Sequence, residues 1–310
     1  MVINSAAVEL PEDQRALLPS SGDVEFYEEH GWWVSPPIFS DEQMDEALRS
    51  VERHYAGERD SAPPTQLASY LDWTPEKGED RLRINNYIAL QQRGLGALAL
   101  SPLLGATAAR LARTEEVRLF NSSLVYKPPQ VEGDAAKVGW HVDRAYWQTS
   151  TSENMLTAWV AFHDCDEEMG TITMLNGSHR WPSDPVLDEL RTGRTFVTDD
   201  VDALEQRLES LGLPIEKVPI NVRRGQVSFH HCMTFHGSGT NRSDRPRISM
   251  TVHMQDEQNR YREAYDAAGE LFVYRNDTVC RKLPSGEPDY RDPDICPVIW
   301  RDQDAVPASV

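Results

Sequence analysis

The chain has 310 residues, 39% of them hydrophobic, which is enough to bury a sizeable core as one large domain or two smaller ones. Its 50 acidic residues outnumber 31 basic ones and give a formal net charge of −19, so nucleic-acid phosphates and anionic membrane surfaces would repel it. We therefore expect neither nucleic acid nor a membrane as a partner.

The four cysteines contain no Cys-x-x-Cys pair, which favours a reducing cytoplasm over a disulfide-stapled secreted scaffold. The N-terminal residues lack the basic start and apolar run of a signal peptide, and no stretch of about eighteen apolar residues predicts a membrane span. We expect a soluble, cytoplasmic, single-domain protein, with residues 1–20 forming a flexible arm.

Two helices are predicted near the N-terminus. Asp23 can cap a short helix that ends at Gly31, and residues 32–34 then continue as a first strand. Ser40 and Gln43 form a capping box for a second helix, whose apolar face consists of Met44, Ala47, Leu48, Val51 and Tyr55.

The next stretch alternates between strands and a helix. Residues 58–80, rich in Pro, Asp and Glu, predict a loop, and residues 83–89 a strand. Residues 95–113 predict one amphipathic helix with Pro102 near its first turn. Residues 117–126 alternate as a strand that leads through a proline pair into a glycine-containing loop.

Further strands follow at residues 155–163, 171–175, 225–230 and 247–254. In the first of these, Thr157, Trp159 and Ala161 share the face that we expect to point into a cavity. Residues 183–220 interrupt the pattern with a helix-like stretch and form either an inserted lid or a surface excursion. Residues 256–310 form a C-terminal extension without periodicity. Many strands, long loops and N-terminal helices predict a mainly β fold with flanking α-helices, a double-sheet jelly roll.

The strongest chemical signal is the segment 139–143. Residues two apart in an extended segment share a face, so His141 and Asp143 can offer a nitrogen and an oxygen to one point. With a second histidine they would leave three positions of an octahedral ion open, as in non-haem Fe(II) oxygenases. His236, followed by a glycine-rich turn and an alternating strand, is our choice; His230 and His231 are the internal alternatives, for which packing and hydrogen bonding is the competing interpretation.

Other candidate residues have simpler interpretations. His179 lies in a turn where a histidine more often braces backbone than binds metal. Cys165 and Cys232 are expected to be small buried apolar residues, because no basic neighbour lowers the thiol pKa.

These residues together resemble the phytanoyl-CoA dioxygenase family of Fe(II)- and 2-oxoglutarate-dependent oxygenases. The resemblance extends from about residue 22 to 255. It rests on His141-x-Asp143, Trp159, the turn Asn176–His179, His236-Gly-Ser-Gly, Arg247 and the stretches 26–34 and 124–129.

The resemblance implies a double-stranded β-helix of the cupin-like kind that binds Fe(II), 2-oxoglutarate and O2. His141, Asp143 and His236 would be the metal ligands. Arg247 is the candidate for the distal carboxylate of 2-oxoglutarate, since a guanidinium offers it two parallel donors. Ser238 and Ser249 would add hydroxyl donors, Trp159 would flank the co-substrate, and Asn121 would touch its keto-acid end.

The implied reaction decarboxylates 2-oxoglutarate to succinate and CO2 and oxidises a C–H bond of a small-molecule substrate. With the Asp143 carboxylate present, hydroxylation is the default outcome, and desaturation, ring closure and demethylation are the alternatives. A zinc hydrolase and a non-catalytic jelly-roll binding protein that retains a metal are the competing classes, and turnover of 2-oxoglutarate would separate them.

The substrate is expected to come from secondary or amino-acid-derived metabolism. Arg144, Tyr146 and Trp147 directly follow the metal triplet and are expected to line the substrate pocket. An aromatic wall with one cation suits a polar or anionic molecule, whereas the acidic surface favours a cationic one.

Overall fold

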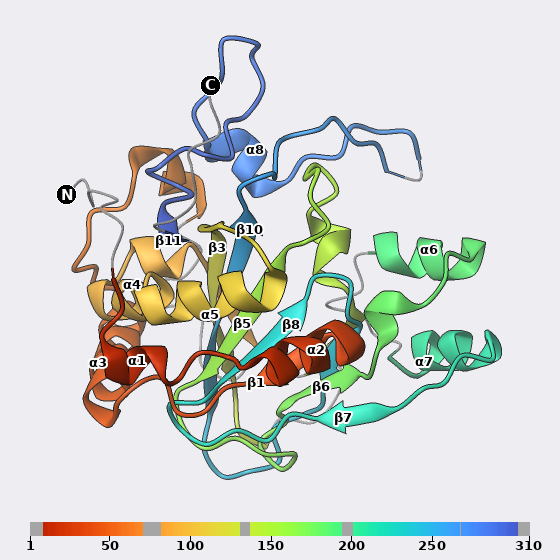
Figure 1. Ribbon diagram of the computed structural model, residues 1–310, viewed down its shortest axis with the longest axis horizontal. Helices are drawn as coiled ribbons and strands as arrows, with labels where there is room; N and C mark the ends of the chain where they lie inside the picture. Colours follow the sequence, from red (N-terminus) through yellow and green to blue (C-terminus); the bar gives the residue numbers. More distant parts are fainter. Residues whose placement is uncertain (1–8, 71–81, 131–136, 194–200, 267, 303–310) are drawn as a thin grey trace.

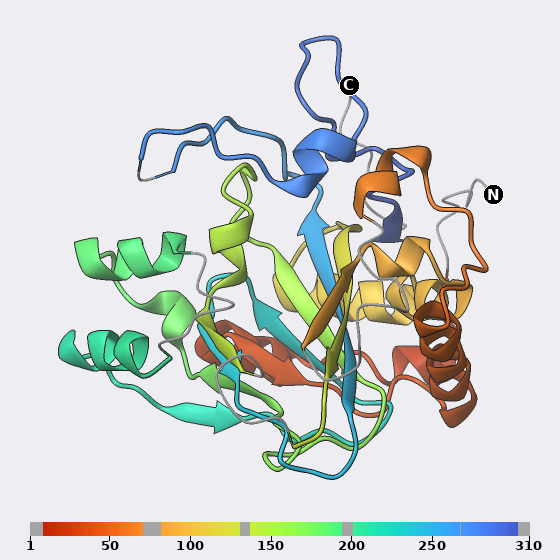
Figure 2. The same ribbon diagram turned by 180° about the vertical axis from the view of Figure 1, so that it is seen from behind.

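The computed structural model describes residues 9–70, 82–130, 137–193, 201–266 and 268–302. Within these residues two antiparallel sheets face each other (Figures 1 and 2). The larger has seven strands in the order β1-β8-β5-β10-β3-β11, with β2 also paired to β3, and the smaller has the order β4-β9-β6-β7. This is the double-sheet jelly roll that the sequence predicts.

The strands are β1 (Trp32–Val34), β2 (Arg83–Asn86), β3 (Glu116–Lys127), β4 (Val138–His141), β5 (Leu156–Ala161), β6 (Ile172–Leu175), β7 (Lys217–Pro219), β8 (Val227–His231), β9 (His236–Ser238), β10 (Arg247–Asp256) and β11 (Val298–Arg301). The α-helices are α1 (Glu12–Arg15), α2 (Ser21–His30), α3 (Asp41–Tyr55), α4 (Arg93–Ala99), α5 (Pro102–Ala112), α6 (Pro185–Thr192), α7 (Val201–Ser210) and α8 (Arg275–Val279). Short 3-10 turns include η1 (Thr65–Tyr70), η3 (Ile88–Leu90), η5 (Asp143–Tyr146) and η6 (Ser178–Arg180).

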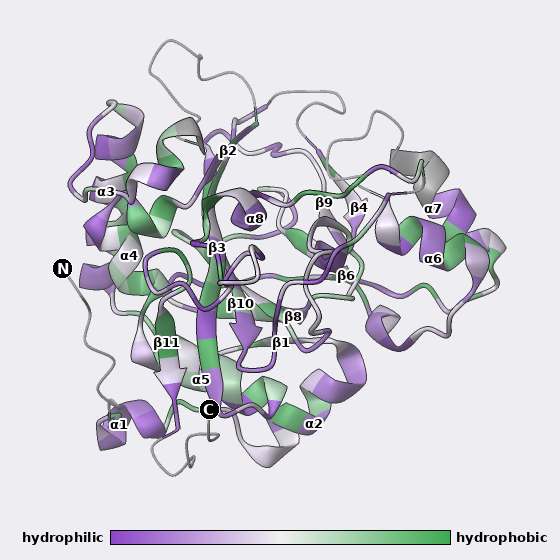
Figure 3. Ribbon diagram, turned by 90° about the horizontal axis from the view of Figure 1, so that it is seen from above, coloured by the Kyte–Doolittle hydropathy of each residue, from purple (hydrophilic) through white to green (hydrophobic). Residues whose placement is uncertain are grey.

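The N-terminal helices cover the outer face of the larger sheet (Figure 1). Their apolar residues form one core with the outward-facing side chains of β3, β5, β8 and β10. Peripheral helices such as α3 and α6 carry both polar and apolar segments in Figure 3, as expected for helices with one buried face. The capping box predicted at Ser40 and Gln43 is confirmed.

The start of the chain differs from the prediction in two ways. Leu10 is only 4% exposed and belongs to the core, so a flexible arm is wrong for residues 9–20, while residues 1–8 lie outside the described part. Ser20, rather than Asp23, caps α2, and Asp23 is the third helical residue of a reciprocal capping box. The predicted helix end at Gly31 is confirmed, because this residue has the left-handed φ of 77°.

The helix predicted over residues 95–113 is two helices, α4 and α5. Pro102 is the first residue of α5, where its missing N–H costs nothing, whereas inside a continuous helix it would break the hydrogen-bond ladder. Contrary to the sequence interpretation, Arg93–Ala112 is long and apolar enough to cross a membrane by length and composition alone. However, 72% of that stretch is buried inside the protein, as expected of core helices.

The register of β10 decides which side chains face the smaller sheet. Arg247 pairs with Lys127, and His253 pairs with Asn121 on β3 and with Thr157 on β5. Since side chains alternate along a strand, the odd-numbered residues of β10 and β5 share the inner face. Of the three residues predicted to face the cavity, Thr157 and Trp159 line it and Ala161 does not.

The described part of the C-terminal extension has more regular structure than its sequence pattern indicates. It contributes α8 and the edge strand β11, which pairs with β3. The β3–β10 register skips Phe120, and the carbonyl oxygen of this bulged residue accepts a 2.7 Å hydrogen bond from Asn276 Nδ2. Bulges re-aim side chains and interrupt pairing, and this one anchors the start of α8 over the sheet.

The insertion at residues 183–220 packs beside the metal segment. Its described helices form a separate apolar cluster with Trp140, Val142 and Ala145. Among the described residues of this insertion, none lines the cavity, and residues 194–200 fall outside the described ranges.

Candidate metal and co-substrate site

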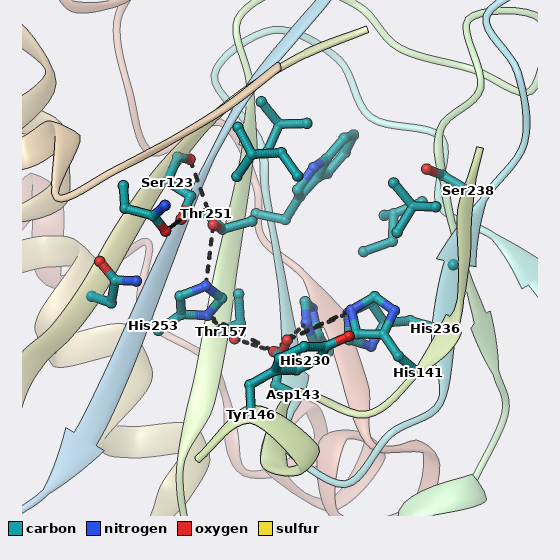
Figure 4. Close-up of a pocket in the computed structure, with 18 of the residues that line it drawn as sticks. Ser123, His141, Asp143, Tyr146, Thr157, His230, His236, Ser238, Thr251 and His253 are labelled. Atoms are coloured by element: carbon teal, nitrogen blue, oxygen red, sulfur yellow. Dashed lines mark hydrogen bonds and ion pairs between the residues drawn. The ribbon is translucent and has the colours of Figure 1, made fainter. Parts of the chain in front are cut away.

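A cavity of about 460 Å³ lies between the two sheets. One wall comes from β2, β3, β5, β8 and β10, and the other from β4, β6 and β9, as Figure 4 shows for the labelled residues. Cavities of this size are typical of small-molecule sites. The three candidate metal ligands lie inside it.

His141, Asp143 and His236 converge on one point. Their ligand atoms lie within 4.8 Å of one another, and all three residues are buried. The Nε2 atoms of His141 and His236 lie 3.9 and 3.7 Å from Asp143 Oδ1. Two neighbouring strands and one turn supply them, because β4 ends at His141, η5 begins at Asp143 and β9 begins at His236.

The backbone fixes the tautomer of both histidines. His141 Nδ1 lies 2.8 Å from the carbonyl oxygen of Gly139, and His236 Nδ1 lies 2.9 Å from that of Thr234. A carbonyl only accepts, so each Nδ1 carries the hydrogen and each Nε2 presents its lone pair toward Asp143. Such hydrogen bonds orient imidazoles for metal binding. The donor set therefore fits a ferrous ion.

The second oxygen of Asp143 is held by a directed chain of hydrogen bonds (Figure 4). Thr157 Oγ1 lies 2.5 Å from Asp143 Oδ2 and 2.8 Å from His253 Nδ1. Because a carboxylate only accepts, Thr157 donates to Asp143 and accepts from His253. His253 Nε2 in turn accepts from Thr251 Oγ1 at 3.3 Å. Oδ2 is thus engaged by the protein while Oδ1 faces the two histidines.

Burial sets the charges in this cluster. It lowers the pKa of His236, His230 and His253 to about 4 and also lowers the pKa of His141, so the imidazoles are neutral near pH 7. Burial alone would raise the pKa of Asp143, but the charge interaction with His236 and the hydrogen bond from His230 hold it well below its usual range. The site presents two neutral imidazoles and one carboxylate, the protonation states that metal binding requires.

Arg247 lies on the cavity wall, six residues along β10 from His253 and therefore about 20 Å away along the strand. Its side chain is buried, its Nη1 donates to the carbonyl oxygen of Gly170 at 2.8 Å, and its Nε has no hydrogen-bond partner among the described residues. Trp159 lies beside it, with the ring centre 5.7 Å from the guanidinium carbon. A buried guanidinium with an unused donor fits a carboxylate ligand.

Ser238 lies on the cavity wall opposite Arg247 and is fixed by a lysine that sequence reasoning did not single out. Lys127 is fully buried, and its Nζ donates to Ser238 Oγ at 2.7 Å. Burial and then the charge of Arg247 lower the pKa of Lys127 well below its usual range. The strand pair Lys127–Arg247 therefore concentrates donors at the end of the cavity where we expect a carboxylate.

The structure places the remaining predicted co-substrate residues less directly. Asn121 lines the cavity at the level of His253, and its amide donates to the Tyr274 hydroxyl at 3.1 Å. Ser249 shares the inner face of β10 but lies outside the cavity lining, and its buried hydroxyl has no hydrogen-bond partner among the described residues.

One substrate-pocket prediction is wrong. Tyr146 and Trp147 line the cavity, but Arg144 does not. The turn η5 directs Arg144 away, and its buried guanidinium donates to the carbonyl oxygens of Trp147 and of Ser150, the latter at 2.7 Å. Arg144 thus braces the turn instead of facing a substrate.

The competing residues behave largely as expected. His230 lies against the site, with Nε2 3.2 Å from Asp143 Oδ2, and packs on the ring of His236 at 4.3 Å. His231 packs instead against His179, and His179 Nε2 donates to the carbonyl oxygen of Glu28. Cys165 and Cys232 are buried, and burial raises the pKa of both thiols.

Comparisons with known proteins agree with this geometry. Residues 27–249 match the family model of phytanoyl-CoA dioxygenase (PhyH). The chain belongs to the phytanoyl-CoA dioxygenase family. It is 29% identical over 243 residues to ectoine dioxygenase of Bordetella bronchiseptica, which covers 74% of this chain and 73% of that protein. The chain is accordingly an Fe(II)- and 2-oxoglutarate-dependent oxygenase.

Solved structures show the same fold. EctD from S. alaskensis, solved with 2-oxoglutarate and 5-hydroxyectoine, superposes with a TM-score of 0.64 at 21% identity over 93% of this chain and 89% of that one. The epimerase SnoN, solved with Fe3+, alpha ketoglutarate and nogalamycin RO, gives a TM-score of 0.63 at 22% identity over 93% of this chain and 99% of that one.

Some residues of the site were missed by sequence reasoning about function. Thr251 and His253 share the alternating face of β10 with Arg247, so the period-two pattern could have identified them. Tyr274 and Arg275 also line the cavity, but they come from the extension without periodicity, where no local pattern indicates them.

Proposed function

We propose that this protein hydroxylates an unactivated C–H bond of a small molecule from secondary or amino-acid-derived metabolism, with release of succinate and CO2. The observation that carries the proposal is that the His141, Asp143 and His236 donors and the buried Arg247 lie in one cavity. When bound, ferrous iron and 2-oxoglutarate supply the oxidising chemistry together with O2. A cytoplasmic location is also proposed, supported by four cysteines that are all free thiols.

The residues of the chain have distinct tasks in this proposal. His141, Asp143 and His236 hold the metal, and Thr157 keeps the second oxygen of Asp143 turned toward the protein. Arg247 binds the distal carboxylate of 2-oxoglutarate through its paired donors.

The walls between these two ends orient the co-substrate and exclude water. Trp159 flanks the co-substrate, Ser238 adds a hydroxyl donor that Lys127 holds in place, and the buried Asn121 lies near the keto-acid end. Tyr146, whose ring meets His141 edge-on at 5.9 Å, and Trp147 bound the space for the substrate. Exclusion of water limits oxidation of anything except the positioned C–H bond.

Iron content and slow substrate-free conversion of 2-oxoglutarate to succinate test the proposal. His141→Ala, Asp143→Ala and His236→Ala are each expected to lose both, because two protein ligands hold a labile ferrous ion poorly. His231→Ala is the control, since this histidine packs away from the site.

Full iron binding in His236→Ala with loss in His230→Ala would show that the second ligand is misassigned. A wild-type protein that binds iron and 2-oxoglutarate but forms no succinate would contradict the proposal and favour a non-catalytic role. Hydrolysis supported by zinc would favour the hydrolase.

A further inference from the structure

Arg275 is a cation on the cavity wall that co-substrate binding does not use. Among the described residues that line the cavity, the histidines are neutral and the charged side chains are Asp143, Arg247 and Arg275. Asp143 faces the metal position and Arg247 lies six residues along β10 from the metal level. Arg275 belongs to neither group, because it comes from the C-terminal extension at the start of α8.

Both neighbours of Arg275 are fixed against the sheet, so its backbone is held in place beside the cavity. The Tyr274 ring stacks on Phe120 with centres 5.3 Å apart, and its hydroxyl accepts a hydrogen bond from Asn121. Asn276 is fully buried, donates to the bulged carbonyl of Phe120 and accepts from the Tyr87 hydroxyl at 2.8 Å. Figures 1 and 2 show α8 above the end of β3 and β10.

The side chain of Arg275, in contrast, is not held. It is exposed, and among the described residues its guanidinium makes no hydrogen bond or ion pair. Arg144, the cation that the sequence suggested for the substrate pocket, instead donates to backbone carbonyl oxygens. A guanidinium on a cavity wall whose five donors are not used by the described residues is available for a planar oxyanion.

Charge balance supports the same conclusion. Ferrous iron and Arg247 together carry as much positive charge as Asp143 and doubly ionised 2-oxoglutarate carry negative charge, so these four groups balance one another. Arg275 then adds a positive charge that no carboxylate of the described cavity wall compensates. The chain as a whole has a formal charge of −19, so this cation is opposite in sign to the net charge of the protein.

We propose that the primary substrate carries a carboxylate or a similar oxyanion and that Arg275 binds it, which orients the substrate between Arg275 and the metal. This inference rests on the proposed function, since it names the substrate class of that same site. It selects the anionic substrate over the cationic one that the acidic surface favoured. The two arginines then divide the work, with Arg247 taking the co-substrate carboxylate and Arg275 the substrate.

The test uses a panel of small carboxylates, each paired with its neutral primary amide, on the full-length protein with Fe(II) and 2-oxoglutarate under anaerobic conditions. Thermal shift finds the carboxylates that bind the wild type, and calorimetry gives their dissociation constants. We expect each amide to bind at least about tenfold more weakly than its carboxylate. Arg275→Gln should weaken carboxylate binding by about tenfold or more, and Arg275→Lys should restore only part of it.

Arg223→Gln is the matched control, because Arg223 is also exposed and lies outside the cavity lining. It should bind the carboxylates as the wild type does. The inference is overturned if no carboxylate of the panel binds, if the amides bind equally well, or if Arg275→Gln, folded by its melting curve, binds within twofold of the wild type. Failure of the proposed function appears separately, as absence of succinate from the wild type.

Discussion

Replacement of Thr157 by valine tests whether the hydrogen-bond chain behind Asp143 prepares the metal site. Valine has nearly the same shape as threonine and has no hydroxyl. The change therefore removes one of the two donors to Asp143 Oδ2, the other being His230 Nε2, and, at the same atom, the acceptor for His253 Nδ1. Thr157 is fully buried, so water does not readily replace either partner.

The two losses have different sizes and different readouts. A hydrogen bond to a charged group contributes about 1.5–3 kcal/mol, and loss of the partners that orient metal ligands typically costs about 10–100-fold in metal affinity. The buried His253 N–H without an acceptor costs about 1–3 kcal/mol of stability. For 310 residues the entropy of unfolding is roughly 0.65 kcal/mol per kelvin, so the melting temperature should fall by about 2–5 °C.

Ferrous affinity is measured anaerobically by competition with a chromogenic chelator, and stability by thermal melting of the metal-free protein. Thr157→Ser is the matched control, because it keeps the hydroxyl and removes only a methyl group. It should retain iron affinity within a few-fold of the wild type. If Thr157→Val binds iron within twofold of the wild type, the hydrogen bond does not orient Asp143 and the reasoning is wrong.

Three further predictions follow from single residues. Arg247→Lys keeps the charge but loses the paired donors, so the KM for 2-oxoglutarate should rise at least about tenfold without a change in melting temperature. A KM within about twofold of the wild type would show that Arg247 does not bind the co-substrate. Trp147 is 2% exposed and emptying its site costs roughly 3–5 kcal/mol, so Trp147→Ala should lower the melting temperature by about 5–8 °C and should also uncouple succinate formation from substrate oxidation. Tyr146 is half-buried, so Tyr146→Ala should uncouple the two reactions with little change in melting temperature. Intact coupling in both variants would show that the two rings are core residues only. Burial lowers the pKa of His54 and His231 to about 3, below the unfolded value of 6.5. The stability that these two histidines contribute is therefore present above pH 6.5 and is lost as the pH falls toward 3. Urea unfolding should show that the free energy of unfolding falls by about 2 kcal/mol per histidine between pH 7 and pH 5, and His231→Gln should reduce this loss.

Local pattern was sufficient for two of the three metal ligands and for the inner face of β10. The spacing of His141 and Asp143 and the alternation of β10 from Arg247 onward are properties of short segments. Both depend on the two-residue period of an extended backbone, which does not require distant contacts. The choice of His236 over His230 depended on the resemblance to a family, because both histidines are buried beside Asp143 and no local rule separates them.

Side-chain direction after a turn was beyond the sequence. Arg144 follows Asp143 directly, but η5 turns it away, where its backbone N–H donates to the carbonyl oxygen of Cys232 at 3.0 Å. The helix break at Pro102 was predictable in principle, because a proline five or more residues inside a helix removes a needed donor. The placement of α8 was not, since it depends on contacts between Asn276 and residues 156 and 189 positions away in the chain.

The residues proposed to bind the metal and the co-substrate lie inside the family match, whereas part of the cavity wall lies outside it. The match over residues 27–249 includes every proposed metal and co-substrate residue, whereas Tyr274 and Arg275 come later and complete the cavity wall. A wall segment that is not tied to the iron chemistry can vary without disturbing the metal ligands, provided that it keeps an anchor on the sheet. Here the anchor is the carbonyl oxygen of the bulged residue Phe120, which accepts a hydrogen bond from Asn276, the residue next to Arg275. The names of relatives therefore carry information about the reaction but little about the substrate, and the substrate of this protein is better sought from the charge of Arg275 than from similarity.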